Sequence, residues 1–362
     1  MSRAKQEKPA RPAADGTPSS TGRPGTVLKW VGGATAVLSL VFGLRQLSVL
    51  ISESRDRQRQ VTELIATAKL QREAKDYRSG WLSLEKAAEL RASESKVRTA
   101  QEDLAMAWLD DIHGTKEATP FTAIVDLLVP VLSRGAVTSA GTRKADLLAH
   151  LGWADFLRWR DGQNGLDPAA RYTQALAADS QNVYAHAMLA HWMMWNHGEL
   201  EDANRHFAAA LKTARERAYV RGLQLAALQE MPEGTGDPEM IRVANEMRKA
   251  NEPIDPSDLG QIWYAYYWRF VSSPNESVGP LFAAVPPPEQ VATYRWAFQN
   301  TDYPGSKGFL YEYHLARLED AAGQQVEALE TYRSVRSKMT PDTIARLRRR
   351  VDSAIVRLGG KH

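Results

Sequence analysis

The chain of 362 residues contains no cysteine. Disulfide bridges, cysteine-ligated zinc sites and thiol nucleophiles are therefore excluded, although this absence does not fix a cellular compartment. Common catalytic motifs are also missing: there is no G-x-S-x-G elbow, no glycine-rich phosphate-binding loop and no H-E-x-x-H pair. No segment alternates polar and apolar residues over the length of a strand. The sequence therefore predicts an all-α protein that is not an enzyme.

Four histidines lie close together in the sequence and invite comparison with a metal site: His186, His191, His197 and His206. Their spacings of five, six and nine residues do not place pairs on one helical face, as a spacing of four does. Residues 161–165 resemble an acidic calcium loop but lack its alternating ligands and distal glutamate. We therefore expect no metal ion and no cofactor, and we interpret residues 161–165 as a turn.

The net charge is small, +3, but it is unevenly distributed. Residues 1–29 carry six Lys or Arg against two Asp or Glu, and residues 341–362 carry the same numbers. The middle of the chain is therefore acidic, which argues against a body that binds nucleic acid.

Residues 1–26 are rich in Pro, Ala, Gly, Ser, Arg and Lys and have almost no large apolar side chain. Such a segment cannot bury enough surface to offset the entropy of ordering it, so a disordered basic tail is predicted. Two interpretations stay open: a plain solvated tail, or a basic segment that lies against an anionic membrane surface.

Residues 27–51 are the one candidate for a membrane-spanning helix. The uncharged core, residues 30–44, has fifteen residues, which gives roughly 22 Å of helix against a hydrocarbon thickness of ~30 Å. Lys29 and Arg45 can extend their charges to the two interfaces, and Trp30 suits an interface anchor. A cleaved signal peptide is the alternative, but its apolar core would be shorter and Arg45 interrupts the expected cleavage region. We therefore predict an uncleaved single span.

The orientation of this span follows from the charges beside it. The basic tail favours a cytoplasmic N-terminus, with the repeats that follow on the periplasmic or exoplasmic side. The other end of the span is also basic, and the charges there nearly balance this bias: Arg45, Arg55, Arg57 and Arg59.

One face of the predicted span carries only small residues, spaced four, three and four apart: Gly32, Ala36, Ser39 and Gly43. Small residues let a second helix approach closely, and in lipid such packing drives association. This face predicts either a homodimer or a contact with a different membrane protein.

Residues 183–211 read as two amphipathic helices that fold back on each other across a turn at 196–198. One face of the first helix carries Leu189, Ala190 and Met193. One face of the second helix carries a small–aromatic–small set, Ala203, Phe207 and Ala210. The alanines allow the helices to approach, and the aromatic ring fills the gap between them.

The same frame recurs at two distant places. In residues 310–335 the matching positions are Leu315, Ala316, Gly323, Ala328, Tyr332 and Val335. In residues 64–87 they are Ala68, Gly80, Leu84 and Ala87. A half-match precedes the best repeat, at Tyr172 and Ala175. The pattern resembles the tetratricopeptide repeat (TPR) family. It departs from that family at Ala190 and Ser180 and by one extra residue in the turn; coincidental alanines in ordinary amphipathic helices are the alternative.

The resemblance implies a TPR-like solenoid of helical hairpins over residues 52–340, closed by a capping helix at 341–362. It also implies a concave groove, lined by the first helix of each repeat, that holds a peptide or a partner helix. The implied groove residues are Tyr184, Ala187, His191 and Met194 in the best repeat, and Tyr313 and Arg317 in the last. Family members that clamp a carboxylate have Asn at the position of His191. The resemblance therefore implies an aromatic groove for an apolar or amphipathic segment.

Further amphipathic helices are predicted at residues 102–112, 121–132 and 144–160, and Pro130 is expected to bend or end the second. Asp255 is expected to cap another helix. In the capping helix an apolar stripe is formed by Ile344, Leu347, Val351, Ile355 and Leu358. The arginines mostly stand off that stripe: Arg346, Arg348, Arg349 and Arg350. They form either the solvated face of a terminal repeat or a patch for anionic lipid or nucleic acid.

These features predict a membrane-anchored scaffold or adaptor that binds a peptide or partner protein in its groove. Two other classes stay open. One is a structural accessory subunit of a larger membrane complex, without a free peptide ligand. The other is an enzyme whose site follows no recognisable motif.

Overall fold

The computed structural model describes residues 27–91, 94–112, 120–196, 200–272, 278–299, 301, 303–304, 308–340 and 345–359, without the side chains of 27–45, 47–50 and 233. These described residues are helical or irregular and include no strand, which confirms the predicted all-α class. The chain divides into two compact units, residues 1–62 and 63–362.

The predicted span, residues 27–51, is helical and belongs to the long helix α1 (Val27–Glu73). Its side chains at 27–45 and 47–50 lie outside the described residues, as does the predicted tail 1–26. The membrane span and the face formed by Gly32, Ala36, Ser39 and Gly43 therefore stay predictions.

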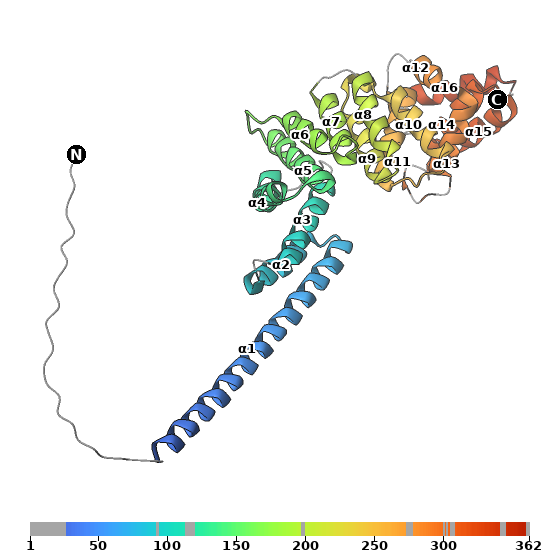
Figure 1. Ribbon diagram of the computed structural model, residues 1–362. Helices are drawn as coiled ribbons and strands as arrows, with labels where there is room; N and C mark the ends of the chain where they lie inside the picture. The colour runs from blue at the N-terminus through green and yellow to red at the C-terminus, as the bar shows by residue number, and fades with distance from the viewer. Residues whose placement is uncertain are drawn as a thin grey trace, which may run out of the picture. The chain divides into compact units, whose positions relative to one another are not determined.

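The second unit is a succession of helices (Figure 1). They are α2 (Tyr77–Arg91), α3 (Ser95–Asp110), α4 (Phe121–Thr138), α5 (Gly141–Arg160), α6 (Pro168–Ala178), α7 (Val183–Trp195), α8 (Leu200–Lys212), α9 (Arg217–Gln229), α10 (Asp237–Lys249), α11 (Pro256–Tyr267), α12 (Gly279–Ala284), α13 (Pro287–Phe298), α14 (Phe309–Ala321), α15 (Gln325–Lys338) and α16 (Ala345–Arg357). A 3-10 turn, η1 (Pro232–Gly234), precedes α10, and a π-helix, η2 (Trp268–Ser272), continues α11.

Two kinds of helix contact build the second unit. Consecutive helices pair, most extensively α5 with α6, α14 with α15, α4 with α5, and α7 with α8. Alternate helices also pack on one another, so that α3, α5, α7, α9 and α11 form a continuous row. The helix partners that the repeats predicted, α7–α8 and α14–α15, are therefore present.

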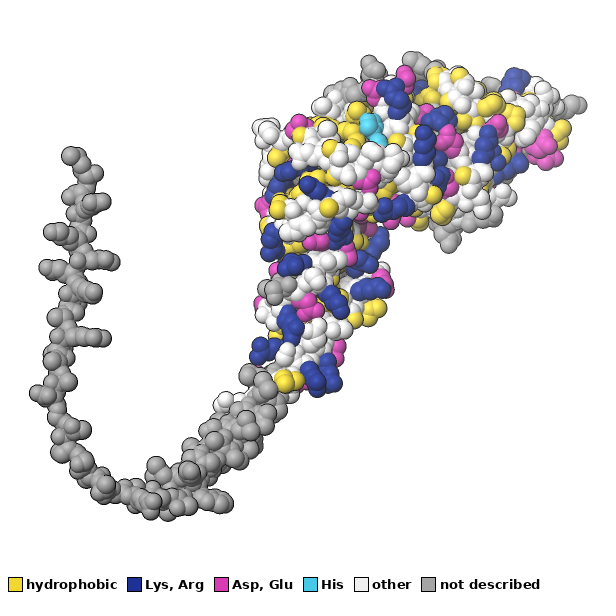
Figure 2. Space-filling model, viewed as in Figure 1, with side chains coloured by type: hydrophobic (Ala, Val, Ile, Leu, Met, Phe, Trp, Pro, Cys, Tyr) yellow, Lys and Arg dark blue, Asp and Glu magenta, His cyan; other side chains and the backbone are white. Residues whose placement is uncertain are grey.

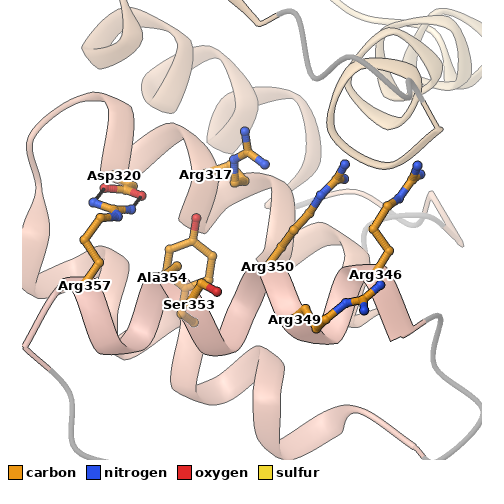
Figure 3. Close-up of a pocket in the computed structure, with 9 residues that line it drawn as sticks. Arg317, Asp320, Arg346, Arg349, Arg350, Ser353, Ala354 and Arg357 are labelled. Carbon is orange, nitrogen blue, oxygen red and sulfur yellow. Dashed lines mark hydrogen bonds and ion pairs between the residues drawn. The ribbon is translucent and has the colours of Figure 1, made fainter.

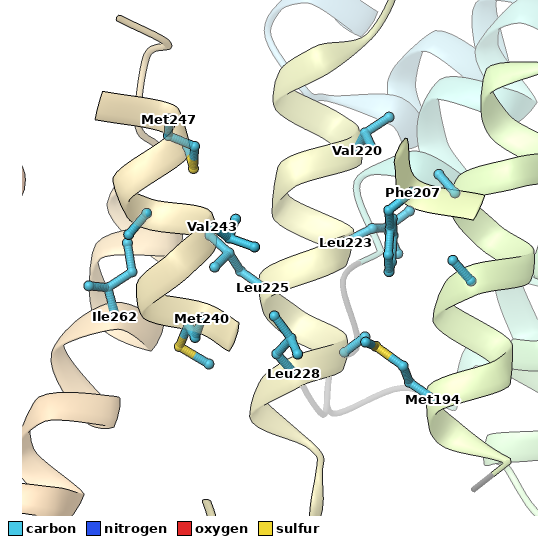
Figure 4. Packing of buried hydrophobic residues seen from close by; sticks show 14 of the residues in the cluster. Met194, Phe207, Val220, Leu223, Leu225, Leu228, Met240, Val243, Met247 and Ile262 are labelled. Carbon is cyan, nitrogen blue, oxygen red and sulfur yellow. The ribbon is translucent and has the colours of Figure 1, made fainter. Parts of the chain in front are cut away.

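The residues of the small–aromatic–small pattern pack inward. Ala203, Phe207 and Ala210 of α8 are fully buried, and so are the matching residues of α15, Ala328, Tyr332 and Val335. Figure 4 shows Phe207 and Leu223 of α9 pointing toward one another. A small residue on either side of the ring leaves room for the neighbouring backbone, and burial of the ring supplies most of the stabilisation.

Helix starts follow from local capping. Asn182 accepts a hydrogen bond from the N–H of Ala185 at 2.9 Å, and Asp255 accepts one from Ser257 at 2.9 Å, as expected for Asp255. The start of α4 is capped from a distance, because Oδ2 of Asp161 accepts from the Thr122 N–H at 2.6 Å. The turn that contains Asp161 therefore helps to fix the start of α4.

The predicted end of this helix near Pro130 is wrong, since α4 continues to Thr138, and the alternative of a bend at Pro130 stays a prediction. Proline removes one backbone hydrogen bond. However, Val131 and Leu132 beyond it are buried, and α4 packs between α3 and α5. This burial outweighs the lost bond. Among the described residues α4 is also the one helix long and apolar enough to cross a membrane by length and composition.

Candidate functional site

A cavity of about 510 Å³ opens beside the row of alternate helices. Its wall comes from the turn before α2, the end of α3, the start of α9 and the start of α11. It is lined by Lys75, Tyr77, Ala107, Asp110, Asp111, Glu216, Ala218, Tyr219, Gly222, Asp255, Ser257 and Asp258. No single repeat supplies this set, because the fold brings residues 75–111 against residues 216–258.

The lining of this cavity is strongly acidic: five carboxylates stand against a single lysine. Nζ of Lys75 lies 2.6 Å from Oδ1 of Asp111, and this hydrogen bond and charge raise the pKa of Lys75. The imbalance is local. Over the visible face of residues 63–362, Lys and Arg side chains are interspersed with Asp and Glu side chains (Figure 2). A cationic group would therefore be attracted to the acidic cavity.

Asp258 is the least hydrated of these carboxylates. It lies in the first turn of α11 with only 4% of its surface exposed. Burial, and next the neighbouring charge of Asp255, raise its pKa to about 6. No cation of the described chain pairs with it. A buried carboxylate without a counter-ion is costly, so a bound basic side chain would stabilise its charged form.

Three rings in edge-to-face or tilted contact connect the cavity with α7. The ring of Tyr219 lies 5.5 Å from that of Tyr184, which in turn lies 4.7 Å from that of His150. Nε2 of His150 is 3.0 Å from Oδ1 of Asp110, and Asp110 is itself one of the residues that line the cavity. Tyr184, a residue of the implied groove, thus stands directly behind the acidic cavity.

The other implied groove residues of α7 are buried. Ala187 has no exposed surface, and His191 and Met194 are 5% and 8% exposed. His191 lies in an aromatic cluster, where its Nε2 accepts a hydrogen bond from Nε1 of Trp195 at 3.1 Å. Their contact with a partner stays a prediction, and their burial leaves a partner little surface to touch.

The implied groove residues of α14 lie apart from the acidic cavity. Tyr313 is fully buried, whereas Arg317 lines a different cavity beside α16. The structure therefore does not bring the six implied residues into one continuous site.

Two of the clustered histidines do meet. The Nδ1 atoms of His186 and His206 lie 2.8 Å apart across the α7–α8 pair, so one nitrogen donates and the other accepts. Burial and the charge of His186 lower the pKa of His206. Within the described residues, no group of three or more His, Asp or Glu side chains is placed to hold a metal ion; His197 lies outside them.

Sequence reasoning missed the acidic cavity. Its signals were the Asp110–Asp111 pair at a helix end and the Asp255-x-x-Asp258 start of α11. Each looks like ordinary helix capping or solvated charge. Only the fold shows that the two pairs share a wall.

Comparison with known proteins adds no relative: no family model matches the chain, and no curated protein matches its sequence. The resemblance to the TPR family therefore rests on the residues themselves.

Proposed function

We propose that this protein is a membrane-anchored helical-repeat scaffold of the TPR type. In this proposal the acidic cavity between α3, α9 and α11 binds a basic segment of a partner protein. The anchor is residues 27–51, with a cytoplasmic N-terminus and the repeats on the periplasmic or exoplasmic side. The row of alternate helices supports this proposal, because TPR domains bind partners along such a row.

The observation that carries the binding proposal is the state of Asp258. A buried carboxylate that lacks a counter-ion, in a cavity with four further acids, is an unfavourable arrangement for the free protein. A lysine or arginine of a partner would supply the missing charge. The ring of Tyr219 at the wall would pack on the aliphatic part of that side chain.

The partner chemistry differs from the one that the resemblance implies. An aromatic groove would favour an apolar segment, but the aromatic side chains of α7 are largely covered. The accessible wall is acidic instead. A basic or amphipathic segment with its charged side toward Asp258 therefore fits this cavity better than a purely apolar one.

The proposal is tested with the full-length protein in detergent micelles. The probes are an alternating Lys-Ala peptide and its Glu-Ala counterpart, titrated by fluorescence anisotropy at low salt. We expect saturable binding of the basic peptide only, weakened about tenfold in the Asp255→Asn, Asp258→Asn double variant. The control is Glu327→Gln, Glu330→Gln on exposed positions of α15, which removes the same charge elsewhere. Equal weakening in both variants would point to non-specific attraction.

The accessory-subunit alternative differs in its dependence on the anchor. If the protein is a structural accessory subunit that its anchor holds in a membrane complex, partners are captured by the full-length protein and lost when residues 27–51 are exchanged for an unrelated span. A scaffold with its own site retains the basic partner after that exchange. Retention in the exchanged variant, together with loss in the Asp258→Asn variant, supports the scaffold.

A further inference from the structure

A second cavity, of about 630 Å³, lies against the last helix (Figure 3). It is lined by Arg317, Asp320, Tyr332, Arg346, Arg349, Arg350, Ser353, Ala354 and Arg357. Five arginines therefore share this wall with one acidic residue, the opposite of the cavity beside α11. The C-terminal helix alone contributes four of the arginines.

The single acid is already engaged. Nη1 of Arg357 lies 3.1 Å from Oδ1 of Asp320, and its Nη2 contacts Oδ2, which makes a two-pronged ion pair. This pair raises the pKa of Arg357, first through the hydrogen bond and then through the charge of Asp320. Asp320 therefore neutralises Arg357 rather than the other four arginines.

Two of those four are held by backbone carbonyls. Nη1 of Arg350 donates to the carbonyl oxygen of Phe270 at 3.0 Å, and Nη2 of Arg346 donates to that of Val271. Both acceptors belong to η2. Figure 3 shows the two side chains extending in the same direction from α16. A carbonyl fixes a guanidinium in place without cancelling its charge, and the contact of Arg346 leaves other N–H donors of that side chain available.

Arg317 and Arg349 complete the positive wall. The guanidinium of Arg317 lies 5.3 Å from the centre of the Phe270 ring, and its Nη1 donates to the Tyr313 hydroxyl at 3.2 Å. Arg349 is exposed and forms no hydrogen bond or ion pair within the described residues. Its charge is thus free to act on a ligand.

We propose that this cavity binds a phosphoryl group, carried either by a small phosphorylated molecule or by a phospholipid headgroup. A lone carboxylate is satisfied by one arginine, as Asp320 is by Arg357. A phosphoryl group has more acceptor oxygens and up to two negative charges, so it can use several guanidinium groups at once. Tyr332 lines the same wall, and because burial raises its pKa, its hydroxyl stays protonated and can donate.

The site does not depend on the acidic cavity, because no residue lines both. It also explains the arginines of α16 better than a merely solvated face does. Arg348, on the same helix, does not line the cavity and donates instead to the Thr340 carbonyl. Arg348 therefore provides a matched control that carries the same charge.

The test uses isothermal titration of the full-length protein at constant ionic strength. The probes are inorganic pyrophosphate and dioctanoyl phosphatidic acid, with acetate and dioctanoyl phosphatidylcholine as controls. We expect saturable binding of at least one phosphoryl probe and none of the controls. Tighter binding of pyrophosphate identifies a soluble ligand, and tighter binding of phosphatidic acid identifies a lipid headgroup.

The variants decide whether this cavity is the site. Arg349→Gln should weaken binding about tenfold, since it removes a charge-assisted contact, whereas Arg348→Gln should leave binding unchanged. The triple change Arg346→Gln, Arg349→Gln, Arg350→Gln should abolish binding, with thermal unfolding as the folding check. Arg349 alone keeps the test decisive if the triple variant does not fold. Absence of saturable binding by both probes, or equal binding by Arg349→Gln and the natural chain, overturns the proposal.

Discussion

Nε2 of His150 in α5 lies 3.0 Å from Oδ1 of Asp110 at the end of α3. The imidazole is fully buried, and its Nδ1 faces the Asp146 carbonyl oxygen at 2.6 Å. This pair joins two helices of the row and orients an acid of the cavity wall. It therefore connects the stability of the fold with the charge of the candidate site.

The first prediction concerns the pH dependence of this pair. Burial lowers the pKa of His150, but the charge and hydrogen bond of Asp110, with those of Asp146, raise it further, so the net pKa lies above 6.5. The folded state therefore holds the proton more tightly than the unfolded state. The stabilisation is complete below pH 6.5 and is lost as pH rises through the raised pKa. Urea unfolding should show the natural chain losing stability over this range relative to His150→Gln. Parallel curves for the two proteins would contradict this.

His314 should behave in the opposite way. Burial, and then the charge of Arg317, lower its pKa to about 3, and its Nδ1 lies 3.2 Å from the Tyr294 hydroxyl. As pH falls below 6.5, His314 becomes protonated in the unfolded state but stays neutral in the folded state. Stability therefore falls as pH drops from 6.5 toward 3, by on the order of a few kcal/mol. His314→Gln should flatten the acid limb of the unfolding curve, even if it lowers stability at neutral pH. An equally steep acid limb in the variant would count against this account.

A third prediction tests packing between α5 and α6. A methyl group added to Gly152 would lie 2.5 Å from Cε1 and 2.8 Å from Cδ1 of the fully buried Tyr172 ring. Gly152→Ala should therefore destabilise the protein by about 1–3 kcal/mol, as overpacked sites do. Gly260→Ala is the matched helical control, because its nearest neighbour is the Tyr303 ring at 3.8 Å. We expect Gly260→Ala to be neutral or to stabilise by about 0.5–1 kcal/mol in thermal unfolding. Similar losses in both variants would contradict this packing.

A fourth prediction separates stability from binding at Asp258. Its folded pKa, about 6, lies above the ordinary value of 3.8, so the charged form is disfavoured in the folded state. Stability should fall as pH rises from 3.8 through 6 and then level off. Asp258→Asn should therefore stabilise the protein at neutral pH, on the order of 1–3 kcal/mol by chemical denaturation, while it weakens binding of the basic peptide. A variant less stable than the natural chain at pH 7 would show that the carboxylate has a structural partner.

The sequence predicted the fold well where the spacing of apolar residues along a helix decides which face is buried. Phe207 and the alanines beside it share one helical face, and a face of that kind has to pack inward. Asp255 caps α11 because the backbone N–H groups in the first turn of a helix have no acceptor within that helix, and Asp255 accepts from the N–H of Ser257. Pro130 does not end α4, because the lost hydrogen bond is a local cost, whereas the gain from burying Val131 and Leu132 comes from helices that the sequence does not place.

The candidate site could not be predicted from the sequence, for a related reason. Asp110 and Asp258 are separated by about half of the predicted repeat region, and nothing in either neighbourhood indicates that they line the same cavity. Conversely, His191 occupied a groove position in the repeat pattern, yet it packs among Trp153, Phe156 and Trp195. The resemblance indicates which positions of a helix share a face, but it does not indicate which of those positions remain exposed once the helices pack.

The most direct test of the proposed function is proton release during binding at pH 6. With its pKa near this pH, Asp258 is partly protonated in the free protein, and a basic ligand beside it should lower that pKa and expel the proton. Titration calorimetry of the Lys-Ala peptide into the full-length protein, in two buffers of different ionisation enthalpy, measures this release. We predict that a fraction of a proton is released by the natural chain and none by Asp258→Asn. Binding without proton release, or the same release in both proteins, would contradict the claim that the acidic cavity is the binding site.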